Sequence, residues 1–188
     1  MSKRPVLTLF IWLVSLFLQG SAFSQEPAAA VSAAAPAALP SQAGTETGSV
    51  TGLPMPRFVS LRSDTVYVRA GPGMRYPVKW VYQRRSYPLQ VVQEFDTWRK
   101  VHDMEGDEGW VHQSLLSGNR HVLVQGASPA TLYKKPASDA RAVAQIEPSV
   151  VAKLNECADT WCNVSVSGYS GWLLKSSLWG VYEHEESE

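Results

Sequence analysis

The chain has 188 residues, with 17 basic and 17 acidic side chains, so its formal net charge is zero. That length is enough for one or two small domains. The balanced charge excludes the basic surface by which proteins bind nucleic acids, and we therefore expect no nucleic-acid partner.

Residues 1–24 have the pattern of a secretory signal peptide. Two basic residues precede an apolar run over residues 6–18, and the small residues Ala22 and Ser24 follow it. The run is shorter than the roughly 20 residues that a membrane-spanning helix needs. We predict cleavage before Gln25, a periplasmic or secreted location, and no membrane-spanning segment.

Residues 25–56 are rich in alanine, proline, serine and glycine. Prolines interrupt the alanine runs that would otherwise favour helix. They are Pro27, Pro36, Pro40, Pro54 and Pro56. A segment of this composition buries too little apolar surface to offset the entropy lost on ordering. We predict a disordered tether.

Residues 57–119 form the first predicted folded unit. Short runs of β-type residues alternate there with turn residues, and no apolar stripe is long enough for a helix of three turns. We expect strands at residues 58–61, 66–69, 78–82, 89–95, 98–103 and 108–112, then one helical turn at 114–118. Many short strands at this spacing are typical of small barrels or sandwiches.

Residues 120–180 form a second copy of the same unit. The triplet Asp-Thr-Trp occurs at residues 96–98 and again at 159–161, and a glycine-tryptophan pair follows it in each copy. A leucine then lies 18 residues after the triplet tryptophan in the first copy and 17 residues after it in the second. This agreement indicates an internal repeat. After it we expect an acidic, frayed tail at residues 181–188.

The only cysteines in the sequence are Cys157 and Cys162, and the second triplet lies between them. In an exported protein a disulfide is their expected state, and it would hold that loop still. A redox-active pair is the alternative. Against it, four residues separate the cysteines instead of two, and no helix start follows that would lower a thiol pKa.

Several signals of the first unit follow one another in a set order. They are Val66-Tyr67-Val68-Arg69-Ala70-Gly71-Pro72-Gly73, Tyr76-Pro77-Val78, Trp98, Glu108-Gly109-Trp110-Val111 and Ser114-Leu115-Leu116. This order resembles that of the bacterial Src-homology-3-like (SH3-like) domain, and the second unit keeps part of it. The resemblance implies an all-β fold of two tandem SH3-like β-barrels with five or six strands each. It also implies a binding module of the kind found in exported bacterial proteins, often beside cell-wall enzymes.

Strand parity indicates which side chains of the first unit could contact a ligand. Trp98 and Val101 are three residues apart and point to opposite faces of a strand, so an inward Val101 leaves Trp98 outward. The surroundings of Trp98 resemble the aromatic groove in which SH3 domains hold proline-rich peptides. The candidate ligand-binding residues are Trp98, Tyr76, Arg69, Arg75 and Tyr67. The alternative is that Trp98 packs against a neighbouring loop or the other unit.

No catalytic constellation is recognisable in the sequence. The nucleophile motif G-x-S-x-G and the metal-binding motif H-E-x-x-H do not occur. His102 and His112 lack a third metal ligand, so we expect no metal, no cofactor and no enzymatic activity. We predict a module that recognises a cell-envelope component, such as a peptidoglycan peptide, through the groove of the first unit. The alternative is a protein-interaction adaptor for a periplasmic protein or a host surface.

Overall fold

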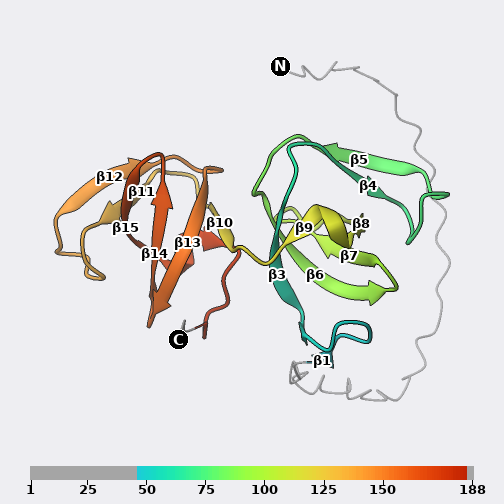
Figure 1. The fold of residues 1–188 in the computed structure, drawn as a ribbon. Coiled ribbons are helices and arrows are strands. Elements are labelled where there is room, and N and C mark those ends of the chain that lie inside the picture. Colours follow the sequence, from blue (N-terminus) through green and yellow to red (C-terminus); the bar gives the residue numbers. More distant parts are fainter. Residues whose placement is uncertain (1–45, 186–188) are drawn as a thin grey trace, which may run out of the picture. The chain divides into compact units, whose positions relative to one another are not determined.

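The computed structural model describes residues 46–185, and Figure 1 shows their strands in chain order. Two seven-stranded antiparallel sheets carry one unit each, and a two-stranded hairpin precedes them. The predicted all-β fold with two tandem units is confirmed. The predicted signal peptide, residues 1–24, and residues 25–45 of the predicted tether lie outside the described residues. Within residues 46–185, no helix is long and apolar enough to cross a membrane.

The first sheet has the strand order β5-β4-β8-β7-β6-β3-β9, so β5 and β9 are its edges. A 3-10 turn, η1, connects β8 to β9. The elements are β3 (Arg57–Leu61), β4 (Val66–Arg69), β5 (Val78–Tyr82), β6 (Pro88–Phe95), β7 (Trp98–His102), β8 (Glu108–His112), η1 (Gln113–Leu115) and β9 (Leu116–Ser117). The long strand β6 pairs with β3 through residues 88–91 and with β7 through residues 90–95.

The second sheet repeats the first, with the order β12-β11-β15-β14-β13-β10-β16. Its elements are β10 (His121–Val124), β11 (Ala130–Tyr133), β12 (Ala142–Ile146), β13 (Val151–Ala158), β14 (Trp161–Val166), β15 (Tyr169–Leu174), η2 (Lys175–Ser177) and β16 (Leu178–Trp179). Each strand takes the place of the strand seven numbers earlier. The repeat predicted from the Asp-Thr-Trp triplets is therefore a repeat of topology.

The two triplets form equivalent hairpin turns. Asp96 has a φ of 48° and Asp159 a φ of 47°, in the left-handed region that aspartate tolerates better than most residues. Trp98 then begins β7, and Trp161 begins β14. The triplet recurs because the chain reverses direction there in both units.

Each sheet encloses its own hydrophobic core. In the first unit Val66, Val68, Val101 and Val111 are fully buried, as alternation along the strands predicts. The second core has the same plan and includes the branched side chains of Val122, Leu132, Val164 and Leu173 among its buried members.

A disulfide joins Cys157 on β13 to Cys162 on β14, as predicted. The two residues are direct partners in the antiparallel register, with Cα atoms 4.0 Å apart. Only 3% of Cys157 and none of Cys162 is exposed. Thiol–disulfide exchange requires a thiolate to reach a sulfur atom, so this burial favours the structural interpretation over the redox-active one.

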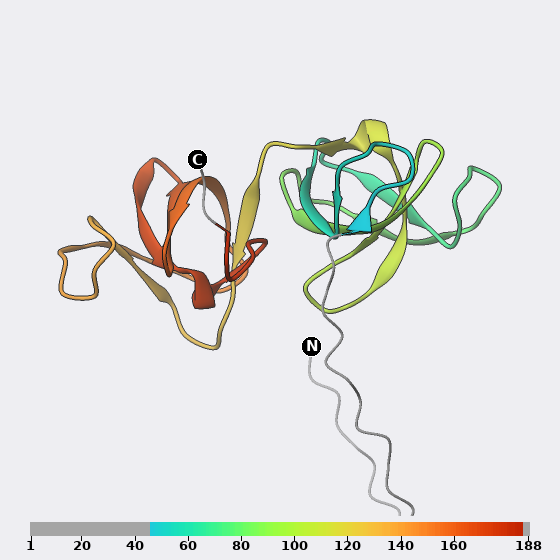
Figure 2. The ribbon, with the colours of Figure 1, turned by 90° about the horizontal axis from the view of Figure 1, so that it is seen from below.

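Residues 46–55, which we expected to be disordered, form a short hairpin of β1 (Glu46–Thr47) and β2 (Pro54–Met55). Figure 2 shows this hairpin, in cyan, beside the first sheet. The backbone N–H groups of Val50 and Thr51 donate to Glu94 Oε2 on β6, at 3.0 and 2.9 Å. The expectation was wrong here because composition does not reveal hydrogen bonds to a partner more than forty residues away.

Residues 181–185, which we expected to fray, are held on the second unit. Arg120 Nη1 lies 2.9 Å from Glu185 Oε1, and Lys175 Nζ donates to the backbone oxygen of Glu185 at 2.7 Å. The acidic composition predicted a solvated tail, but the Glu185 carboxylate is paired with Arg120. Residues 186–188 lie outside the described part of the chain.

Candidate functional site

Trp98 lies at the start of β7 on the face opposite to the core residue Val101, as strand parity predicts. Its ring meets the ring of its cross-strand partner His112 edge to face, with centroids 5.5 Å apart. Only 8% of Trp98 is exposed. The ring thus points outward but is covered by a residue of the neighbouring strand β8, and the ligand contact of Trp98 stays a prediction.

Arg69 organises the loop between β4 and β5. Its Nη1 donates hydrogen bonds to the backbone oxygens of Met74 and Tyr76, at 3.1 and 2.8 Å. The Tyr76 ring lies on Gly71, where a Cβ atom would come within 2.5 Å of the ring. Gly71 is therefore required at this position, since any other side chain would displace the Tyr76 ring from the loop.

Arg75 completes this loop. Its guanidinium lies over the Tyr76 ring, 5.1 Å from the centroid, and its Nη2 donates to the Tyr76 hydroxyl at 3.2 Å. A guanidinium over an aromatic face is a favourable cation–π arrangement. The structure thus brings Arg69, Arg75 and Tyr76 together, as the candidate groove requires.

Tyr67 is 53% exposed and stands opposite Val81 on the outer face of β4 and β5. On the same face Arg69 is opposite Val78, which is 41% exposed. We call the surface formed by Tyr67, Arg69, Arg75, Tyr76, Val78 and Val81 the β4–β5 face. Trp98 belongs to β7 and packs on β8 instead.

The two valines of the β4–β5 face were not among the predicted site residues. A signal was present for Val81 alone, because an inward Trp80, which packs against the core, turns its neighbour Val81 outward by alternation. Val78 could not be assigned in this way, since the register shifts between Val68 and Arg69.

Glu94, on β6, is the centre of a buried ionic network in the first unit. It accepts hydrogen bonds from Thr51 Oγ1 and Arg57 Nη2, each at 2.7 Å, and lies 3.4 Å from Arg99 Nε. Burial by itself would raise the pKa of Glu94, but these hydrogen bonds and those from the hairpin backbone lower it to about 2. The carboxylate is fully engaged, so the network is a structural element.

Asp103 organises the acidic turn after β7 in the same manner. Its carboxylate accepts hydrogen bonds from Tyr82 Oη at 2.7 Å and from the backbone N–H of Asp107 at 3.0 Å. Burial and the bond to Asp103 raise the pKa of Tyr82. Among residues 46–185, no cluster of histidine, cysteine, aspartate or glutamate side chains has a geometry that could hold a metal ion.

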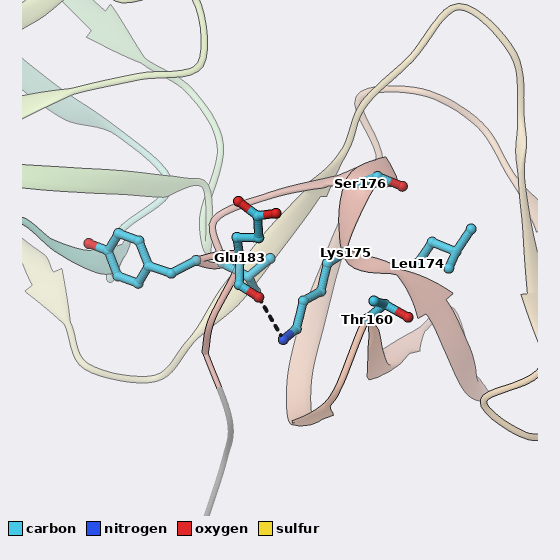
Figure 3. Close-up of a pocket in the computed structure, with 7 residues that line it drawn as sticks. Thr160, Leu174, Lys175, Ser176 and Glu183 are labelled. Carbon is cyan, nitrogen blue, oxygen red and sulfur yellow. Dashed lines mark hydrogen bonds between the residues drawn. The ribbon is translucent and has the colours of Figure 1, made fainter. Parts of the chain in front are cut away.

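A pocket of about 540 Å³ lies in the second unit, and no pattern in the sequence predicts it. Its walls come from the triplet turn, the end of β15, η2 and the tail. The lining residues are Thr160, Leu174, Lys175, Ser176, Val181, Tyr182 and Glu183. Figure 3 shows the Lys175 side chain between Thr160 and the backbone of Glu183.

Comparison with solved structures gives distant likenesses. The chain is similar to NlpC2 from Trichomonas vaginalis, with 12% identity, a TM-score of 0.32 and coverage of 70% of this chain and 51% of that one. It is similar to NlpC1 from the same organism, with 13% identity, a TM-score of 0.30 and coverage of 65% and 45%. It is also similar to an NlpC/P60 family protein from Bacillus cereus ATCC 10987, with 16% identity, a TM-score of 0.29 and coverage of 65% of this chain and 55% of that one.

The chain thus spans about half the length of these proteins, and such low TM-scores support no conclusion about function. No curated protein matches the chain. A family model described as the bacterial SH3 domain matches residues 62–118 and again residues 126–180. These two matches fall on the two sheets and cover more than half of the sequence. The chain belongs to the bacterial SH3 domain family and carries two copies of the domain in tandem.

Proposed function

We propose that the protein is a non-catalytic module that binds a cell-envelope peptide, such as the peptide of peptidoglycan, on the β4–β5 face. The observation that carries this proposal is the ordered set of Tyr67, Arg75 and Tyr76 on that face. Tyr67 is 53% exposed, and Arg75 is stacked on Tyr76. Aromatic rings beside an arginine are the side chains most often found at the energetic centre of binding surfaces.

The loop that carries two of these residues is already fixed before any ligand arrives. Arg69 holds it through two backbone oxygens, and Gly71 lets the Tyr76 ring pack flat against the loop. A site that needs no ordering loses less conformational entropy on binding. The exposed Arg75 guanidinium could then pair with a peptide carboxylate, for which its planar fork is suited.

The second unit does not repeat this surface. Tyr133 stands opposite Trp172 there, as Arg69 stands opposite Trp110 in the first unit. The Tyr133 ring packs edge to face on Trp161, with centroids 5.6 Å apart. With no arginine at this position, the following loop lacks the hydrogen bonds that Arg69 makes, so a surface of the β4–β5 kind is assigned to the first unit alone.

An exported location supports the proposal. The Cys157–Cys162 disulfide fits an oxidising compartment, because cytosolic reductants keep most cysteines reduced. Residues 1–24 carry the signal-peptide pattern described above.

Sedimentation with purified peptidoglycan tests the proposal. We expect the wild-type protein to pellet, and the double variant Tyr67→Ser with Arg75→Gln to bind about ten-fold more weakly, a loss of ~1.4 kcal/mol. Tyr169→Ser is the matched control, since Tyr169 is 54% exposed on β15 of the second unit. A wild-type protein that stays in the supernatant would refute wall binding. Equal pelleting of all variants would refute only the β4–β5 face as the site.

A protein partner is the second candidate, and the edge strand β5 favours it. β5 ends the first sheet and exposes 41% of Val78 and 38% of Val81. Edge strands offer unpaired backbone groups to which a strand of a partner can add. Photo-crosslinking from position 81 in cells separates the two candidates, since an adaptor gives a discrete protein adduct and a wall binder gives adducts with muropeptides.

A further inference from the structure

Lys175 is a buried lysine in the pocket of the second unit. Only 9% of the residue is exposed, and its Nζ donates to the backbone oxygens of Glu183 at 3.1 Å and Glu185 at 2.7 Å. An ammonium group has three N–H donors, so one has no acceptor among the described residues. Within residues 46–185, no carboxylate lies within ion-pair distance of Lys175. A buried charge normally has such a partner.

The equivalent position in the first unit is Gln113, which is connected to the Glu94 carboxylate through Arg99. Gln113 begins η1 as Lys175 begins η2. The backbone N–H of each donates to the backbone oxygen of the threonine in its triplet, at 2.8 Å. Gln113 Oε1 accepts a hydrogen bond from Arg99 at 2.6 Å, and Arg99 is paired with Glu94. In the first unit the cation at this end of the sheet, Arg99, is therefore neutralised by the Glu94 carboxylate of the same unit.

The second unit has lost that internal carboxylate. Cys157 and Cys162 face each other on β13 and β14 at the step where Glu94 and Arg99 face each other on β6 and β7. The second unit has its positive charge at Lys175, and a neutral disulfide occupies the step that holds the Glu94–Arg99 pair in the first unit. Within the part of the chain that the structure describes, Lys175 thus lies beside the pocket with no carboxylate in the place of Glu94.

We propose that this pocket is a second binding site, which takes a carboxylate carried on a small apolar group, such as the free C-terminus of a short peptide. The ligand carboxylate accepts the third N–H of the Lys175 ammonium and supplies the counter-charge that Glu94 supplies in the first unit. This site is independent of the β4–β5 face.

The remaining walls fit such a ligand. Leu174 and Val181 give apolar surface, and Thr160 adds a hydroxyl. A volume of about 540 Å³ lies in the ordinary range of small-ligand sites. Glu183 also lines the pocket, but Figure 3 shows its carboxylate turned away from Lys175 Nζ while its backbone oxygen faces that atom.

Titrations followed by ¹H–¹⁵N NMR on the protein in its exported form test this proposal with three probes. They are N-acetyl-alanyl-alanine with a free carboxylate, the same dipeptide as its C-terminal amide, and hexanoate. We expect the free peptide acid to shift the amide signals of Thr160 and Ser176, and the peptide amide to bind at least ten-fold more weakly. Binding of hexanoate as tight as that of the peptide identifies a site for small free acids, and weaker binding identifies a peptide terminus. Equal binding of the peptide acid and its amide, or no binding of any probe, overturns the proposal.

Two lysine variants localise the effect. Lys175→Met keeps the apolar stem and removes the charge, and it should weaken binding of the acid at least ten-fold. Lys153→Met removes an exposed lysine from β13 and should leave binding unchanged. Wild-type affinity in Lys175→Met overturns the assignment.

A third variant covers the case in which Lys175→Met does not fold. Glu183→Gln removes a negative charge from the pocket wall and should tighten binding of the acid about two-fold without changing that of the amide. An equal effect on both probes overturns the proposal. Tyr67→Ser, which tests the β4–β5 face, should leave these titrations unchanged, so failure of one site is distinguishable from failure of the other.

Discussion

Glu94 and Arg99 face each other across the β6–β7 hairpin, with Arg99 Nε 3.4 Å from Glu94 Oε1. Cys157 and Cys162 face each other at the same step of the β13–β14 hairpin, where a disulfide takes the place of the ion pair. Each pair is the second from the turn made by an Asp-Thr-Trp triplet. The two units thus hold the same hairpin by different chemistry, one sensitive to pH and the other to reductants.

Substitution of Glu94 should destabilise the first unit strongly. Glu94→Gln leaves the buried Arg99 and the largely buried Arg57 without their anion, and breaking a buried ion pair costs about 3–5 kcal/mol. Urea unfolding, followed by hydrogen exchange at β6 and β7 amides, measures the loss. Glu108→Gln is the control, because the exposed Lys100–Glu108 pair should contribute less than about 1 kcal/mol. Equal losses for the two variants would contradict a structural role of the Glu94 network.

The same network predicts a loss of stability in acid. The pKa of Glu94 falls from 4.5 to about 2 on folding, so its contribution is present above pH 4.5 and is lost as the pH falls through 2. The contribution is on the order of 3 kcal/mol, from the size of this shift. Urea midpoints of the first unit, measured from pH 6 down to about pH 2, should fall in wild type and change much less in Glu94→Gln. If the urea midpoints of both proteins fall equally with pH, other carboxylates cause the loss of stability in acid.

Reduction of the disulfide should have a modest effect, confined to the second unit. The bond joins residues that are only five positions apart in the sequence, and the chain-entropy estimate for so short a loop is about 2 kcal/mol. Urea unfolding of a Cys157→Ser/Cys162→Ser variant measures the loss through hydrogen exchange at β13 and β14 amides. The first-unit amides serve as the internal control, and a loss of protection there would contradict independent stabilisation of the two hairpins.

The glycine of the repeated glycine-tryptophan pair should be required for packing. A Cβ atom on Gly171 would lie 2.5 Å from the backbone oxygen of Tyr133 and 2.8 Å from Leu132 Cγ. Gly171→Ala must therefore displace β11, and we expect a loss of about 2 kcal/mol or more. Gly118→Ala is the control, since a Cβ atom there meets no atom within 4 Å. Thermal unfolding midpoints compare the two, and similar midpoints would contradict the packing explanation.

Local rules predicted much of the fold but only part of the candidate site. Alternation identified the buried Val66, Val68, Val101 and Val111, because inward positions on a short strand differ from outward ones by a single residue. The same rule placed Trp98 on the outer face, yet it could not show that His112 would cover the ring. Exposure depends on neighbouring strands, which parity does not describe.

The order of turns, strands and repeated triplets is a local property, so the sequence by itself determined the two-unit all-β fold, the repeat and the cysteine pair. Long-range partners decided the rest. The hairpin before β3 is ordered by the Glu94 carboxylate on β6, and the tail beyond β16 is ordered by Arg120 and Lys175. These contacts join residues that are distant in sequence or lie in unpatterned segments, so only the tertiary structure could show that Lys175 is buried beside a pocket.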